Sequence, residues 1–150
     1  KLQMVFDKGL YDPANEPDIA YAHLFSYFKG EEWRTQKETQ RLLDKYFTTK
    51  PDGIPGNDDT GTMSSWAIFN MIGFCPGLPE YTLTTPVFNK VTIRLDPKWY
   101  KENELVIETN RTQPGVLYID KVLLNGKKFN KYHITHDELV HGKYLKFDLK

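Results

Sequence analysis

The sequence predicts an α+β chain in which helices come first and a small, antiparallel, sandwich-like β-rich segment follows. Near residue 80 the apolar spacing changes from about every third residue to strict alternation. One segment, 62–72, is apolar on nearly every face, which is typical of a buried helix. A hairpin signal at 125–126 indicates antiparallel strands. We therefore expect a helical part over 1–79 and a β-rich part over 80–150.

The composition limits the classes of partner. The 150 residues carry 20 basic and 20 acidic side chains, so the formal net charge is zero. Nucleic acids and anionic membranes both require clustered positive charge and are not expected as main partners. No apolar run reaches the roughly 20 residues that span a bilayer. The chain starts at Lys1 without a signal peptide, so we expect a mature protein, a trimmed one or a piece of a larger one.

The first predicted helix follows Asn15, whose side chain is a good helix cap. Glu16, Pro17 and Asp18 are residue types favoured in a first turn. Gly30 ends the run. Between these limits the apolar residues recur every third position, at Ile19, Ala22, Phe25 and Phe28.

Two further helices are predicted, over 32–47 and 62–72, with a Gly- and Pro-rich loop over 51–61 between them. The apolar residues of the second helix concentrate in its last turns, so it is only partly amphipathic. The third helix needs cover on every side, which two such helices cannot give. We expect part of this cover from the β-rich part and the rest from polypeptide outside this sequence.

Alternating apolar residues predict strands around 91–95, 104–109, 116–124 and 145–149. The dipeptide at 125–126 is Asn-Gly, which favours a two-residue hairpin turn. A short helical turn is also predicted, opened by a capping box from Thr135 to Glu138 and closed by Gly142.

Cysteine and histidine give no sign of a reactive site. Cys75 is the only cysteine and lies beside an apolar stretch, so a buried structural thiol is favoured over a reactive one. The four histidines lack the paired spacing of a zinc site, and His133 and His136 are expected at the surface or as capping residues. Of the three tryptophans, which can stack on sugars, Trp66 is expected in the core. Trp33 is the better candidate for a partly exposed site, with a core position as its default expectation.

The 51–61 loop carries the chemistry, because it holds two adjacent carboxylates among residues that permit sharp turns. Asp58 and Asp59 could face a ligand or a metal. Alternatively, Asp59 or Thr60 caps the following helix and Asp58 is simply solvated. Calcium would suit the oxygen donors of this region, although their spacing does not match an EF-hand. The candidate donors are Asn15, Glu16, Asn57, Asp58 and Asp59.

Residues 56–66, GNDDTGTMSSW, resemble the signature of glycoside hydrolase family 92, the calcium-dependent exo-α-mannosidases. Further family-like strings lie in order at 15–18, 24–27, 33–36, 73–77, 85–88, 90–93, 124–127 and 134–138. The resemblance implies a much longer protein with an N-terminal β-sandwich and a catalytic (α/α)6 barrel. This chain would then supply the last three barrel helices over 1–79, with the catalytic loop at 51–61, and the β-rich segment over 80–150.

The resemblance also implies an activity, the inverting hydrolysis of terminal α-linked mannose, with α-1,2 linkages in glycans as the expected substrate. Asp59 matches the general base, and Asn57 occupies a position that is often a second carboxylate. The roles of Asn57, Asp58 and Asp59 relative to one another are left open. Asn15, Glu16 and Asp59 match the calcium-binding region, and Glu16 and Trp33 match the substrate subsite.

The general acid of the family is a glutamate upstream of this segment, and no glutamate here lies in a matching motif. We therefore expect the chain alone to be inactive, with the rest of the site on the upstream part of the same polypeptide. Family resemblance also implies an extracellular or periplasmic location. The alternative is a non-catalytic carbohydrate-binding or structural module with a degenerate mannosidase fold.

Overall fold

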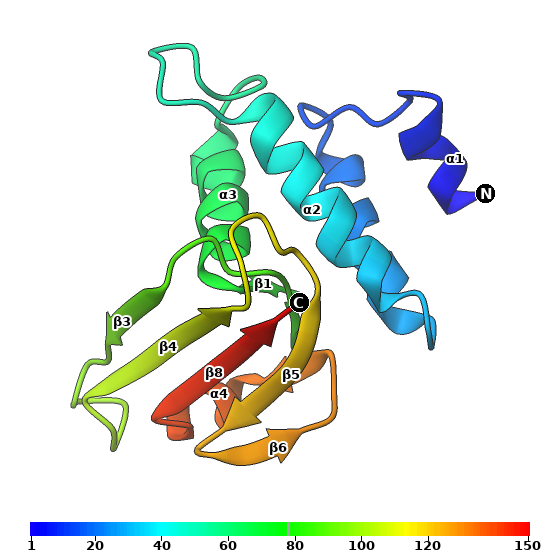
Figure 1. Ribbon diagram of the computed structural model, residues 1–150. Helices are drawn as coiled ribbons and strands as arrows, with labels where there is room; N and C mark the ends of the chain where they lie inside the picture. The colour runs from blue at the N-terminus through cyan, green and yellow to red at the C-terminus, as the bar shows by residue number, and fades with distance from the viewer. Residues whose placement is uncertain (78) are drawn as a thin grey trace. The chain divides into compact units, whose positions relative to one another are not determined.

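The computed structural model describes residues 1–77 and 79–150 and is shown in Figure 1. The chain divides into two compact units, Lys1–Ile68 and Phe69–Lys150. The first unit is helical and the second contains the strands, which confirms the predicted α+β class. Within the described residues, no helix is long and apolar enough to cross a membrane.

The first unit begins with α1 (Leu2–Asp7), a helix that the sequence pattern did not predict. The next element, η1 (Glu16–Tyr27), is a 3-10 helix rather than the expected α-helix. Its apolar residues recur every three positions, which is the period of a 3-10 helix, so the spacing fits the observed element better. The predicted cap at Asn15 is wrong, because its side chain makes no bond to the helix backbone.

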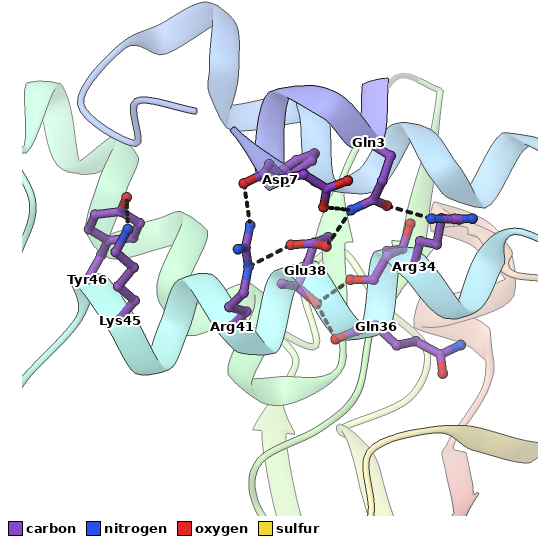
Figure 2. Close-up of polar contacts among 11 residues, drawn as sticks. Gln3, Asp7, Arg34, Gln36, Glu38, Arg41, Lys45 and Tyr46 are labelled. Carbon is purple, nitrogen blue, oxygen red and sulfur yellow. Dashed lines mark hydrogen bonds and ion pairs between the residues drawn. The ribbon is translucent and has the colours of Figure 1, made fainter. Parts of the chain in front are cut away.

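The third element, α2 (Glu32–Tyr46), packs against η1 and buries Leu42 and Leu43 near its end. Its earlier turns bury polar side chains instead, including Glu38. Figure 2 shows Glu38 in a polar cluster: its carboxylate pairs with Arg41 Nε at 2.7 Å and accepts a hydrogen bond from Gln3 Nε2 at 3.0 Å. The cluster joins α1 to α2, so polar contacts replace apolar packing along this stretch.

Helix α3 (Thr62–Ile72) has the predicted bounds and follows a short 3-10 turn, η2 (Asp59–Gly61). Trp66 is buried as predicted. Its ring stacks on Phe47 at a centroid distance of 5.5 Å, and its Nε1 donates to the Ile19 carbonyl at 3.1 Å. Ile68, however, is 58% exposed. The predicted burial on every side is therefore not reached within this chain.

The second unit contains two sheets. One is a three-stranded antiparallel sheet of β1 (Phe74–Pro76), β2 (Glu80–Leu83) and β7 (His133–Thr135), in the order β1-β2-β7. The other has five strands in the order β3-β4-β8-β5-β6. Its strands are β3 (Lys90–Arg94), β4 (Glu104–Arg111), β8 (Tyr144–Leu149), β5 (Ile119–Leu124) and β6 (Lys127–Phe129).

The expectation of a purely antiparallel segment is wrong, because β4 and β8 pair in parallel from Val106↔Tyr144 to Arg111↔Leu149. Between them the chain runs through β5, β6, β7 and the short helix α4 (His136–His141). Parallel neighbours need such a long crossover, whereas a hairpin can only produce antiparallel ones. Figure 1 shows β8 between β4 and β5.

The core of the second unit lies on alternate residues of β4 and β8, and the predicted alternation over 145–149 is confirmed. The hairpin turn is also confirmed, with φ of 51° at Asn125 and 77° at Gly126. Helix α4 carries the predicted capping box between Thr135 and Glu138. Cys75 is buried as predicted, and this burial raises the pKa of its thiol to about 12.

Candidate active-site loop

The 51–61 loop lies against the segment that precedes η1. A Cβ atom added to Gly56 would lie 2.8 Å from the Ala14 Cβ, closer than real Cβ atoms approach, so only glycine permits this packing. Ala14 directly precedes Asn15 and Glu16 in the chain. The structure therefore brings the predicted catalytic loop next to the backbone of the predicted calcium-binding segment, two stretches that are far apart in the sequence.

Asp58 is the residue that anchors the loop to α3. Its Oδ1 accepts a hydrogen bond from the Ser64 backbone N–H at 2.9 Å, and its Oδ2 accepts one from the Ser64 hydroxyl. The Ser64 hydroxyl first, and then its backbone N–H, hold the pKa of Asp58 below its ordinary value. The sequence also allowed that Asp59 or Thr60 caps this helix and that Asp58 is solvated. The structure gives the helix-capping contact to Asp58 instead.

Asp59 is exposed, and its neighbours fix its backbone. The Asp59 carbonyl accepts from Thr62 Oγ1 at 2.6 Å, and the preceding carbonyl of Asp58 accepts from the Gly61 N–H at 2.5 Å. Thr60 has φ of 51° and ψ of 27°, a left-handed conformation that is rare for a β-branched residue. The Asp59 side chain thus projects from a tight turn in which the carbonyls of Asp58 and Asp59 both accept hydrogen bonds.

The predicted calcium-binding residues Asn15 and Glu16 are both exposed. The Asn15 amide donates to Asp18 Oδ1 at 3.2 Å, and Asp18 Oδ2 accepts from the Asp12 N–H at 2.9 Å. Asp18 is buried and organises this turn through both carboxylate oxygens. The sequence suggested only a first-turn acid at this position, since hydrogen bonds back to Asp12 leave no periodic signal.

Trp33 lies at the start of α2 and is 39% exposed, which agrees with a partly exposed site and not with the core position that was its default expectation. Two cations lie near its ring: Arg34 Cζ is 4.7 Å and Lys37 Nζ is 5.9 Å from the ring centroid. Contacts of this kind hold an exposed aromatic ring in one orientation. The ring is therefore partly exposed, with Arg34 and Lys37 near it.

The calcium that the family resemblance implies is not provided for by this chain alone. Over residues 1–77 and 79–150, no group of three or more His, Cys, Asp and Glu side chains could hold a metal ion. Carboxylate and amide oxygens of Asn15, Glu16 and Asp59 suit calcium chemically. They nevertheless do not amount to a metal site without ligands from elsewhere.

Comparison with known proteins identifies the family to which this fold and this loop belong. The model for the glycosyl hydrolase family 92 catalytic domain matches residues 1–150, the whole chain. The chain therefore belongs to glycoside hydrolase family 92.

Known relatives agree with this family. The chain is 28% identical, over 99% of its length, to a protein named uncharacterized secreted glycosidase from Arthroderma benhamiae, of which it covers 19%. It is 32% identical to a family GH92 α-mannosidase structure from Bacteroides thetaiotaomicron, with a TM-score of 0.84 over 95% of this chain and 19% of that one. A family GH92 inverting mannosidase from the same organism is also 32% identical, with a TM-score of 0.79 over 99% of this chain and 20% of that one. The chain thus spans about a fifth of the length of these relatives.

Proposed function

We propose that this chain is the C-terminal part of the catalytic region of an inverting exo-α-mannosidase. The enzyme hydrolyses terminal α-linked mannose, with α-1,2 linkages in glycans as its main substrate. The observation that carries the proposal is an exposed Asp59 on a bonded loop, within a chain that matches the family's catalytic domain over its whole length. The relatives named as mannosidases support the choice of sugar.

In this proposal residues 1–79 are the last three helices of an (α/α)6 barrel, with the catalytic loop at 51–61, and 80–150 are the β-rich segment. The first unit exposes large apolar side chains, including Leu10 at 62%, Phe28 at 61% and Ile68 at 58%. Soluble proteins rarely leave several such side chains uncovered. Cover by the upstream barrel helices accounts for them.

Asp59 acts as the general base of the reaction. It removes a proton from a water molecule whose oxygen forms a bond to the anomeric carbon, on the face opposite the leaving group. The glycosidic C–O bond breaks, and the leaving oxygen takes a proton from a glutamic acid on the upstream part of the polypeptide. In inverting enzymes these two carboxyl groups lie about 6.5–9.5 Å apart, which leaves room for the water.

Three other residues assist this reaction in the proposal. Asn57, which is exposed, holds the attacking water by a neutral hydrogen bond. Glu16 and Trp33 contact the mannose, the tryptophan by stacking on its apolar face. Calcium binding would require further ligands from the upstream polypeptide beside Asn15, Glu16 and Asp59, and no step above is assigned to it. A secreted relative supports an extracellular or periplasmic location.

The full-length polypeptide that contains this chain tests the proposal. We expect it to hydrolyse an aryl α-mannoside and to release β-mannose first, as followed by proton NMR during the reaction. Release of α-mannose first would contradict inversion, and hydrolysis of other aryl glycosides but not of mannosides would contradict the substrate. The chain of residues 1–150 alone should show no turnover, because the general acid is missing. Turnover at ordinary enzymatic rates would contradict the fragment interpretation.

A second candidate function is a non-catalytic carbohydrate-binding or structural module. The family resemblance implies a carboxylate at position 57 in many members, so Asn57 favours this alternative, because an amide cannot take up a proton. If this alternative holds, calorimetry of the full-length protein with mannose, with and without calcium, would show binding, and the protein would leave an aryl α-mannoside uncleaved.

A further inference from the structure

The geometry points to Asp58 as a positioning residue that aims the Asp59 carboxylate by fixing the loop to the first turn of α3. The inference rests on the proposed function, in which Asp59 is the general base. It answers a question that the sequence left open, namely how adjacent Asp58 and Asp59 divide their roles. Asp58 fixes the conformation of the loop, and Asp59 acts as the general base.

The first step is the direction of the Asp58 side chain. Both of its carboxylate oxygens accept hydrogen bonds from one residue, Ser64, through the backbone N–H at 2.9 Å and through the hydroxyl. Two bonds to one partner fix the plane of a carboxylate as well as its position. Asp58 therefore points at the helix terminus, where the unpaired N–H groups of α3 favour a negative charge.

The second step is the shortness of the connection. Only Asp59, Thr60 and Gly61 separate Asp58 from Thr62, the first residue of α3. The Asp58 carbonyl accepts from the Gly61 N–H at 2.5 Å, and the Asp59 carbonyl accepts from Thr62 Oγ1 at 2.6 Å. The backbone on both sides of the Asp59 side chain is therefore bonded, while the side chain itself stays exposed.

The third step is the conformation that these bonds maintain. Thr60 is left-handed, with φ of 51°, directly after Asp59. Threonine adopts this region only where the surroundings impose it. The bonds of Asp58 to Ser64, on the far side of the turn, help to impose it, together with the bond from Thr62 Oγ1 to the Asp59 carbonyl. Without them the turn would relax, and the Asp59 carboxylate would change direction.

Such a change matters because a general base must lie within hydrogen-bonding reach of the water that it activates. A displacement of about 1 Å lowers catalytic rates by roughly a hundredfold. We therefore expect Asp58→Ala in the full-length polypeptide to lower kcat on an aryl α-mannoside by about a hundredfold, with KM changed less than about threefold. Ser64→Ala and Asp58→Asn each keep part of the contact and should lower kcat by about tenfold. Asp52→Ala, at an exposed aspartate of the same loop, is the matched control and should leave kcat unchanged.

Chemical rescue separates a positioning residue from the base itself. Azide can replace the attacking water in a variant that lacks the base, because it needs no deprotonation. Azide should therefore restore mannoside cleavage in Asp59→Ala, as mannosyl azide of inverted configuration, and should give no such product in Asp58→Ala. Rescue of Asp58→Ala but not of Asp59→Ala would reverse the two roles and overturn the inference. If Ser64→Ala and Asp58→Asn both leave kcat unchanged, the inference is overturned as well. These two milder variants keep the test possible even if Asp58→Ala does not fold.

Failure of the proposed function would look different. In that case the wild-type full-length protein cleaves no mannoside, whatever the variants do. Crystal structures of the wild-type and Ser64→Ala full-length proteins then decide the positioning inference without activity. The inference expects the Asp59 carboxylate to move by at least about 1 Å between them. An unmoved Asp59 carboxylate would overturn it.

Discussion

Different interactions hold the turn at 58–64 and the five-stranded sheet of the second unit in place. In the sheet, alternate side chains such as Leu105, Ile107 and Phe147 are almost completely buried, and each contributes to one shared apolar core. In the turn, a few hydrogen bonds to Ser64 and Thr62 hold a single exposed carboxylate. The sheet is thus expected to tolerate polar changes on its exposed face, whereas the turn depends on individual polar atoms.

The sharpest test of this contrast is Asp59→Asn in the full-length polypeptide. Asparagine has the same shape but cannot take up a proton, so kcat on an aryl α-mannoside should fall about a thousandfold. The free energy of unfolding should change by less than about 0.5 kcal/mol, because the side chain is exposed. Steady-state kinetics and urea unfolding measure the two quantities. A large loss in the free energy of unfolding, alongside the loss of kcat, would mean that the Asp59 side chain stabilises the fold as the buried side chains of the sheet do.

Phe147→Ala is the counterpart in the sheet. Phe147 is fully buried on β8, so its truncation should lower the free energy of unfolding by about 3–5 kcal/mol. Lys146→Ala, on the opposite face of the same strand, is the control and should cost less than about 0.5 kcal/mol. Urea unfolding checks both variants, and similar values for the two would show that burial does not order this strand.

A pair of substitutions in the turn should act with opposite signs on stability. Glycine in Thr60→Gly can adopt the left-handed conformation freely and should raise the free energy of unfolding by up to about 1 kcal/mol. Gly61 has φ of 82°, so Gly61→Ala should lower it by about 1 kcal/mol although a Cβ meets only Ser65 Oγ, at 3.9 Å. Thermal unfolding measures both. A loss of stability in Thr60→Gly would mean that the left-handed residue is not strained.

The smallest expected effect is on acid stability. Bonds from Ser64 lower the pKa of Asp58 below 3.8, so this group adds stability that is complete above about pH 4 and is lost as pH falls through the folded-state pKa. The pKa of Glu138 in the second unit is lowered in the same direction, chiefly by the Thr135 backbone N–H and then by Lys131. Asp58→Asn and Glu138→Gln should each flatten the decline in stability between about pH 6 and pH 2.

Unfolding measured over this range compares the two variants with the wild type. An unchanged slope in either variant would show that its carboxylate titrates alike in the folded and unfolded chain. If the dependence of stability on pH becomes flatter in only one of the two variants, only the unit that contains that carboxylate loses stability in acid through it.

Local signals in the sequence predicted local features well. The bounds of α3, the Asn125–Gly126 turn and the capping box at Thr135 follow from residues that are adjacent or at most a few positions apart. A helix after Asn15 was predicted correctly, but its type was not, although apolar residues three apart fit the 3-10 period of η1 better than the α-helical one. Helix α1 was missed because it is short and its Lys1 cap makes no side-chain hydrogen bond.

Features that depend on distant or purely geometric contacts could not be predicted. The parallel pairing of β4 with β8 joins strands that are separated by four other elements of the chain. In the candidate site, the sequence identified Asp58 and Asp59 as a pair but could not separate them, because both are acids in one loop. The contacts of Asp58 with Ser64 distinguish the two, and no periodic pattern encodes them.

The position of β8 has a consequence for synthesis on the ribosome. This strand is the last in the order of the chain, yet in the sheet it lies between β4 and β5. Until residues 144–149 leave the exit tunnel, the pairs β3–β4 and β5–β6 share no strand, and each keeps an open edge of unpaired backbone groups. Nascent chains that stall before this point would therefore expose the unpaired edges of β4 and β5, which can pair with other chains. Pairing of β8 with both strands removes these two edges and lowers the risk of aggregation.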